Sequence, residues 1–143
     1  MSNDSDDVYS TPVASAISGI TAKTLANWKL RGIFVPSVEL LHSTQSRYYY
    51  SYRDLVAIRA LVVLKDFGVD LIRLAHVGAY IQSTAPLQTT FLVVDGGEVF
   101  VADGSAAVAS LLRSGRRAFC VLALQAIASE VERDARALMS SAA

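Results

Sequence analysis

Apolar residues recur at helical spacing near the start of the chain. Ser10 and Thr11 supply hydroxyl caps, and Pro12 suits the first turn of a helix. Val13 and Ile17 then form one apolar stripe, four residues apart. The pattern predicts a short first helix.

A second short helix is predicted after Gly19, which interrupts the first pattern. Thr21 is a suitable cap, Leu25 and Trp28 form the inward positions three residues apart, and the pattern ends near residues 31–32. Two short helices joined by a tight glycine-containing turn indicate a helix-turn-helix, whose second helix enters the major groove of DNA.

The segment Ile33 to Ser46 loses helical spacing. It contains Pro36 and hydroxyl residues, with an alternating patch over residues 38–41. This pattern is typical of a short hairpin or loop, and we interpret it as a wing beside the two helices.

Two longer amphipathic helices follow the wing. Ser51 caps the first and Asp70 the second, while Gly68 suits the left-handed position that closes the first. Their apolar stripes predict two buried faces packed on one core. The stripe residues are Leu55, Ile58, Leu61, Val62 and Leu64, then Leu71, Leu74, Val77 and Ile81.

A boundary at Thr84–Pro86 separates a second part of the chain. Two β-prone runs flank Asp95–Gly97, which is a strong hairpin signal. A short helix over Ser105–Leu112 and a buried strand or helix start over Ala118–Leu124 come next. Gln125–Met139 carries apolar residues at helical spacing between charges, so we expect an amphipathic helix there.

These elements predict an α+β fold. We expect a disordered acidic tail over residues 1–8 and a mainly α-helical winged helix-turn-helix over residues 9–83. A small domain of a hairpin and helices over residues 87–143 would serve dimerisation or bind a partner.

Composition narrows the class of protein. Apolar residues make up 52% of the chain and charged residues 18%, which excludes disorder for most of it. The longest apolar run, Ala118–Leu124, is far short of the roughly 20 residues that span a bilayer. The start is acidic and polar rather than basic and apolar, so we expect a soluble, cytoplasmic protein without membrane contact. Cys120 lies in an apolar run and is interpreted as a small buried side chain.

The net charge of zero hides an uneven distribution. Residues 1–7 carry three Asp, residues 8–80 carry eight Lys or Arg against four acids, and residues 81–143 carry five against six. A modestly basic first part is compatible with phosphate contacts, which supply most of the affinity of DNA-binding proteins.

Three strings of the chain, in this order, resemble the MerR-type regulators over Tyr9 to Ile81. They are VASAISGITAKTLANWKLRGIFVPS, SRYYYSYRDL and AIRALVVLKDFGVDLIRL. They correspond to the family's helix-turn-helix, its wing with the following capped helix, and a helix pair with a glycine between. The resemblance implies a homodimer on a pseudo-palindromic site of double-stranded DNA, with one recognition helix per half-site and the wings on flanking backbone.

The chain also departs from the family pattern. Ala26 stands where many relatives have arginine, and Asn27 and Trp28 where many have a pair of tyrosines. These differences predict that the recognition helix makes fewer contacts to base edges. The second part has no metal-binding cysteine cluster, and is similar to small regulators or antitoxins in which a MerR-like module carries a short extra domain.

The second predicted helix and the wing supply the candidate DNA-binding side chains. Lys23 and Asn27 lie four apart opposite the apolar positions, where lysine can reach guanine or phosphate and asparagine can pair with adenine. Lys29 and Arg31 flank the helix end and suit phosphate. All four also fit ordinary exposed polar residues. The full set is Thr21, Lys23, Thr24, Asn27, Lys29, Arg31, Arg47 and Tyr50.

The wing ends in an arginine followed by three tyrosines. Strand alternation turns either Tyr49 or the pair Tyr48 and Tyr50 inward. The resemblance implies that an arginine and a tyrosine hydroxyl at the exit of the wing bond the DNA backbone. It places Arg47 and Tyr50 at those positions.

Catalytic and metal chemistry find no support in the sequence. Asp54, Asp66 and Asp70 are interpreted as helix caps or surface charges, and His76 stands far from other metal ligands. The pair at residues 96–97 is a hairpin turn rather than a nucleotide loop. We predict no enzyme, no metal and no cofactor.

Three functional hypotheses remain. The first is a homodimeric transcriptional regulator that binds a specific operator. The second is an antitoxin-like autoregulator whose second part binds a protein partner. The third is a regulator that responds to a small molecule.

Overall fold

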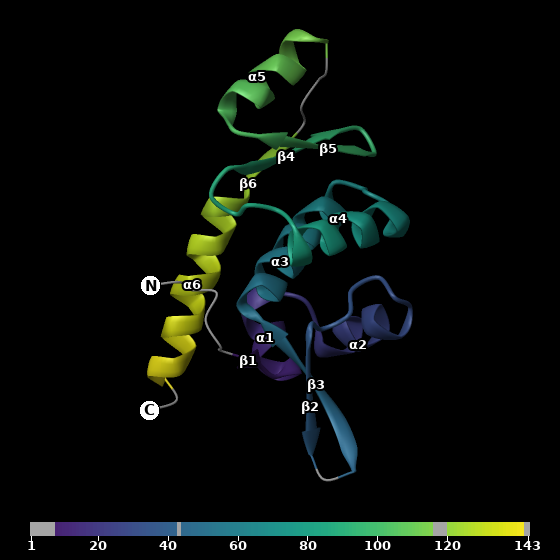
Figure 1. The fold of residues 1–143 in the computed structure, drawn as a ribbon, viewed down its shortest axis with the longest axis vertical. Helices are drawn as coiled ribbons and strands as arrows, with labels where there is room; N and C mark the ends of the chain where they lie inside the picture. Colours follow the sequence, from purple (N-terminus) through teal and green to yellow (C-terminus); the bar gives the residue numbers. More distant parts are fainter. Residues whose placement is uncertain (1–7, 43, 116–119, 142–143) are drawn as a thin grey trace.

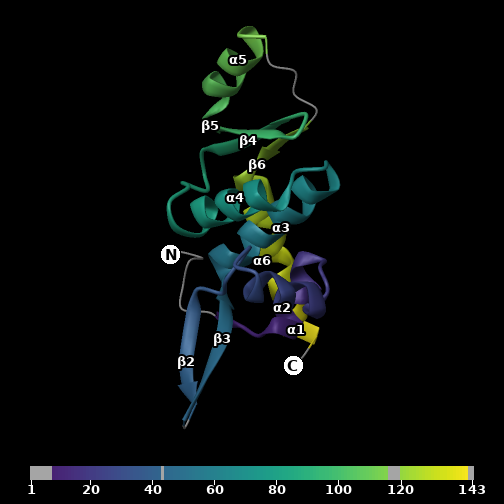
Figure 2. The same cartoon turned by 90° about the vertical axis from the view of Figure 1, so that its right-hand side faces the viewer.

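The computed structural model describes residues 8–42, 44–115 and 120–141. Residues 1–7 of the predicted acidic tail and the first two residues of the predicted run at 118–124 lie outside these ranges. Val8, which was predicted to belong to the disordered tail, instead lies in a short strand. The molecule is elongated: a hairpin projects at one end, a small sheet with a helix lies at the other, and the last helix runs along one side (Figures 1 and 2). The α+β class is confirmed.

The two short helices form where the sequence predicts them. Helix α1 covers Thr11–Ser18 and helix α2 covers Ala22–Leu30. Gly19 ends α1 with φ at 78°, a left-handed conformation that glycine adopts without strain. The chain therefore turns sharply between the two helices, as a helix-turn-helix requires.

The predicted wing is an antiparallel hairpin. Strand β2 covers Val38–His42 and strand β3 covers Gln45–Ser51, so the hairpin extends beyond the predicted segment. A two-residue strand, β1 (Val8–Tyr9), pairs with the end of β3, and the sheet order is β1-β3-β2. We call the β2–β3 hairpin the wing.

The next helix pair was also predicted correctly. Helix α3 covers Tyr52–Asp66 and begins with a capping box between Ser51 and Asp54. Helix α4 covers Leu71–Ser83, and its cap residue Asp70 accepts a hydrogen bond from the Arg73 amide. The chain leaves α3 through Gly68 at φ 87°, as expected.

The second part begins with the predicted hairpin. Strands β4 (Thr90–Asp95) and β5 (Glu98–Asp103) pair, and β6 (Cys120–Ala123) adds to the other edge of β4 in the order β5-β4-β6. Helix α5 (Ser105–Arg113) packs on this sheet. The run that was predicted as a buried strand or a helix start contains both elements: the strand over Cys120–Ala123, which is only partly buried, and the first residue of a helix at Leu124.

Helix α6 (Leu124–Ser141) forms where an amphipathic helix was predicted. The sequence did not predict that this helix packs back against the first part of the chain. It packs against α3 and α1 (Figure 1). The Tyr52 hydroxyl on α3 donates a hydrogen bond to the Ala128 carbonyl at 2.9 Å. Arg59 also reaches Asp134 at 2.6 Å. The two parts that the sequence predicts, residues 9–83 and 87–143, therefore share one hydrophobic core.

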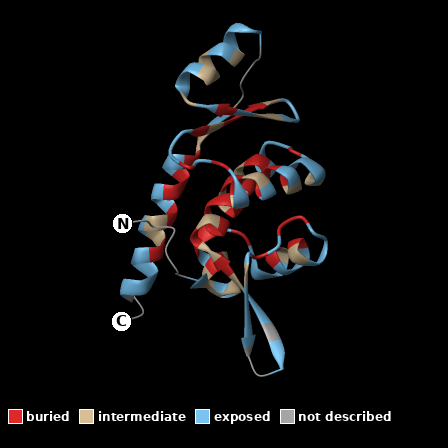
Figure 3. Cartoon of the chain, viewed as in Figure 1, coloured by how far each residue is buried: buried red, intermediate tan, exposed pale blue. Residues whose placement is uncertain are grey.

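The core follows α3 through the centre of the molecule (Figure 3). One cluster of buried residues joins α1, α2, α3, α4, β4 and α6. Within the described ranges, no helix combines the length and apolar character needed to cross a bilayer.

Candidate nucleic-acid interface

The cap and the buried side of α2 fix which way this helix faces. The Thr21 hydroxyl accepts a hydrogen bond from the Thr24 amide at 3.1 Å, and the two hydroxyl oxygens lie 2.8 Å apart. Leu25 and Trp28 are 1% and 3% exposed. Because these two large side chains anchor the helix, its opposite face is held toward solvent.

The outward face of α2 carries a row of polar side chains. Lys23, Asn27 and Arg31 are all exposed and lie four residues apart, so they share one side of the helix and its end. Ala26 beside them is also exposed and adds only a methyl group. The row offers a lysine, an amide and a guanidinium, which can donate hydrogen bonds to base edges or phosphate.

Lys29 joins α2 to the wing. Its ammonium lies 3.6 Å from the centre of the Tyr48 ring, which is a cation–π contact. Lys29 is half-buried, and Tyr48 on β3 is 37% exposed. The sequence did not predict this pair, because nothing local relates two residues that only the hairpin brings together.

A groove of about 460 Å³ lies between the start of α1, α2 and β3. Lys29 and Arg47 supply cations to its lining, and Ser10 and Thr11 supply hydroxyls. Arg47 is exposed and stands opposite Leu40 in the hairpin register. Cations and hydroxyls that converge on one groove are the groups that bind backbone phosphates.

Tyr50, which was expected to face DNA, lies almost wholly within the core, although it contributes to the lining of the groove beside Arg47. Tyr50 is 2% exposed, because β3 runs from the wing into the core and pairs there with Tyr9. Burial, with the charge of Asp54 adding, raises the pKa of the Tyr50 phenol, and a hydrogen bond with Thr11 lowers it in part. The ring supports the root of the wing.

The exposure of the three tyrosines does not follow a simple alternation. Tyr48 is exposed, Tyr49 is half-buried and Tyr50 is buried. Exposure falls from Tyr48 to Tyr50 because the strand passes from the projecting hairpin into the protein. Tyr48 is therefore the ring of the three that the outer surface presents.

Two arginines of the first part form hydrogen bonds within the protein and are not available to bind DNA. Arg53 donates hydrogen bonds to the carbonyls of Ile81 and Ala85, at 2.8 and 2.6 Å. Arg59 binds the carbonyl of Ile17 and the carboxylate of Asp134. The cations left for a partner on the α2 and wing face are Lys23, Lys29, Arg31 and Arg47.

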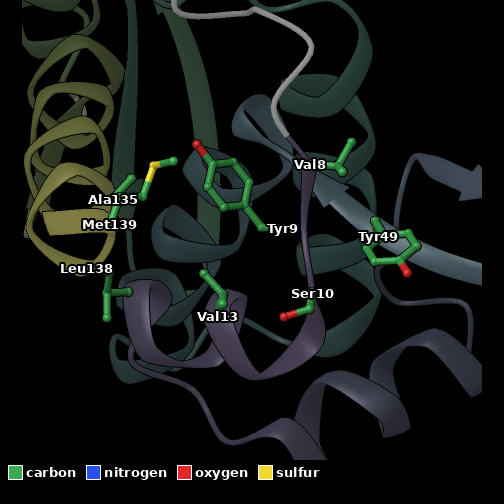
Figure 4. A pocket seen from close by; sticks show the side chains of 8 residues that line it. All are labelled: Val8, Tyr9, Ser10, Val13, Tyr49, Ala135, Leu138 and Met139. Carbon is green, nitrogen blue, oxygen red and sulfur yellow. The ribbon is translucent and has the colours of Figure 1, made fainter. Parts of the chain in front are cut away.

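An apolar groove of about 480 Å³ lies on another side of the wing root, between β1, α1 and the end of α6. Figure 4 shows Tyr9 and Val13 turned toward Leu138 and Met139 of α6. Met139 is 64% exposed at its rim. The groove carries almost no charge, which distinguishes it from the basic groove beside Arg47.

Comparison with known proteins places this geometry in context. Residues 9–79 match the family described as MerR HTH family regulatory protein. Over 113 residues the chain is 29% identical to uncharacterized HTH-type transcriptional regulators of Mycobacterium tuberculosis and Mycobacterium bovis. The alignment covers 78% of this chain and 50% of each relative, so the chain spans about half the length of the curated relatives it matches.

Proposed function

Because residues 9–79 form a helix-turn-helix domain of the MerR family, as the resemblance predicted, we propose that the chain is a sequence-specific transcriptional regulator. It acts as a homodimer on a pseudo-palindromic operator. Each protomer places α2 in the major groove of one half-site and its wing on the flanking backbone.

The observation that carries this proposal is the outward row on α2. Lys23 and Asn27 stand away from the core, while Leu25 and Trp28 fix the helix from the opposite side. A rigid helix with exposed donors is what reading of base edges requires, since each good base contact contributes about 1–3 kcal/mol of discrimination. Arg47 on the wing then supplies a separate contact to phosphate.

Selection of bound duplexes from a random pool, followed by fluorescence anisotropy, tests the proposal. Asn27→Ala should weaken binding to the selected duplex about tenfold and relax the preference at one base position. Arg47→Ala should weaken binding to all duplexes alike, because it removes a phosphate contact. Arg113→Ala is the matched control, since Arg113 is exposed on α5 at the far end of the molecule (Figures 1 and 2).

Salt dependence gives a second readout of the same interface. If Lys29, Arg31 and Arg47 each neutralise one phosphate, log K should fall with log salt at a slope of roughly −3 per protomer. A wild-type chain that selects no duplex, even at low salt, would overturn the proposed function.

The apolar groove and the outer side of α6 support the homodimer. Leu138 and Met139 expose apolar surface at the end of α6. Two copies of α6 in antiparallel contact would therefore cover this exposed apolar surface on each other.

Sedimentation equilibrium tests this arrangement. Met139→Glu should raise the dimer dissociation constant at least tenfold, because it buries a charge in an apolar contact. Ile72→Glu is the control: Ile72 on α4 is 71% exposed, comparable with Met139, and lies outside the proposed contact. A wild-type chain that stays monomeric, or two variants that behave alike, would contradict the arrangement.

A further inference from the structure

One buried carboxylate holds both strands of the wing at their base. Asp54 is 0% exposed, and its Oδ2 accepts hydrogen bonds from the Ser37 amide at 2.8 Å and the Ser37 hydroxyl at 2.7 Å. The same oxygen accepts the Ser51 amide at 3.0 Å. Ser37 directly precedes β2 and Ser51 ends β3, so Asp54 fixes the two ends of the hairpin to the first turn of α3.

The second oxygen of Asp54 is bound from α4. The Gln82 side-chain amide donates to Asp54 Oδ1 at 3.0 Å and to the Val35 carbonyl at 2.7 Å. Val35 lies in the link between α2 and β2. One amide group therefore connects the end of α4 with both the wing root and the link from the recognition helix.

The end of α4 is a fixed point for this amide. Arg53 on α3 binds the carbonyls of Ile81 and Ala85, which lie on either side of Gln82 in the chain. The wing, in contrast, projects away from the helices (Figure 1), and Leu41 near its tip is 72% exposed. Its direction is therefore set mainly at its root and by the contact of Lys29 with Tyr48.

We infer that Asp54 and Gln82 are positioning residues that set the direction of the wing relative to α2, and so the strength of the wing contact with DNA. The inference rests on the proposed function for its DNA contact. Gln82 lies three residues beyond the end of the MerR match at residue 79. A shift of about 1 Å at the root would move the exposed Arg47 out of hydrogen-bond reach of its phosphate.

Gln82 carries the test, because Asp54 also caps α3 and its replacement would disturb the fold. Gln82→Ala removes both hydrogen bonds from a half-buried side chain. It should weaken binding to the selected duplex about fivefold. Gln88→Ala, at an exposed glutamine in the loop after α4, is the control and should bind within twofold of the wild type.

A double-mutant cycle with Arg47→Ala separates positioning from general destabilisation. If Gln82 acts through the wing, Gln82→Ala should cost less than twofold in affinity once Arg47 is absent. Full additivity of the two losses would overturn the inference. So would binding by Gln82→Ala that equals that of the wild type.

Hydrogen exchange of the free protein gives a readout without DNA. In Gln82→Ala the amides of β2 and β3 should exchange at least threefold faster, while those of α5 stay unchanged. Equal exchange in the wing would overturn the inference whatever the binding data. If the wild type binds no duplex, the proposed function fails, and this exchange measurement alone decides whether Gln82 holds the wing.

Discussion

Replacing Arg59 by methionine removes the guanidinium that joins three helices. Arg59 on α3 donates from Nη1 to the Ile17 carbonyl on α1 at 3.1 Å and to Asp134 Oδ2 on α6 at 2.6 Å. Its Nε lies 3.5 Å from Glu130 Oε1. Methionine keeps much of the apolar stem and loses every donor, so the substitution isolates these contacts.

The magnitude follows from the exposure of the partners. The Arg59 side chain is 25% exposed, that of Asp134 34% and that of Glu130 48%. Partly exposed ion pairs contribute up to about 1 kcal/mol, and the bond to the Ile17 carbonyl about 1 kcal/mol. We expect a loss of ~2 kcal/mol in the free energy of unfolding. For a chain of this size that corresponds to a fall of about 6 °C in Tm.

Thermal denaturation followed by circular dichroism measures this change. Arg136→Met is the matched control, because Arg136 pairs with Glu132 on the same helix and is 73% exposed. The control should shift Tm by less than about 1 °C. If Arg59→Met lowers Tm no more than Arg136→Met does, then α6 is not held to α1 and α3 by this guanidinium, and the account of its packing is wrong.

Three further changes test the fold and its charges. Trp28→Ala should cost about 3–5 kcal/mol of unfolding free energy, measured by urea denaturation, and should abolish DNA binding because α2 loses its anchor. Gly78→Ala should cost up to about 2 kcal/mol in the same assay, since a Cβ there meets side-chain carbons of Leu61 and Phe34 at 3.0 Å and this crowding exceeds the gain of about 1 kcal/mol from alanine's helix propensity. The hydrogen bond from Arg59, first among its causes, lowers the pKa of Asp134. A carboxyl whose pKa is lowered by folding stabilises the protein above its unfolded pKa, so urea stability should fall as the pH drops below about 4, and less steeply in Arg59→Met.

Local signals in the sequence were enough to predict most elements of the first part. The caps at Thr21, Ser51 and Asp70 each act within three residues, so a short window of sequence contains both partners. The inward positions Leu25 and Trp28 follow from helical spacing in the same way. The outward face of α2 was therefore predictable, and with it the exposure of Lys23 and Asn27.

Contacts between distant segments could not be predicted. The ammonium of Lys29 meets Tyr48 only after the hairpin has folded back, and α6 meets α3 only after the second sheet has reversed the chain. The burial of Tyr50 could not be predicted for the same reason. A prediction from strand alternation assumes that each face of the strand has the same environment along its whole length. Strand β3 instead passes from solvent into the core.

The central claim is that α2 enters a groove of the duplex, and affinity cleavage tests it most directly. An iron–EDTA group attached at Asn27→Cys, in a Cys120→Ser background, should cut the selected duplex within each half-site. The same group at Arg113→Cys on α5 should leave the half-sites uncut. The claim would be contradicted if the Asn27→Cys conjugate bound the duplex without cutting its half-sites. It would also be contradicted if both conjugates bound the duplex and cut the half-sites equally.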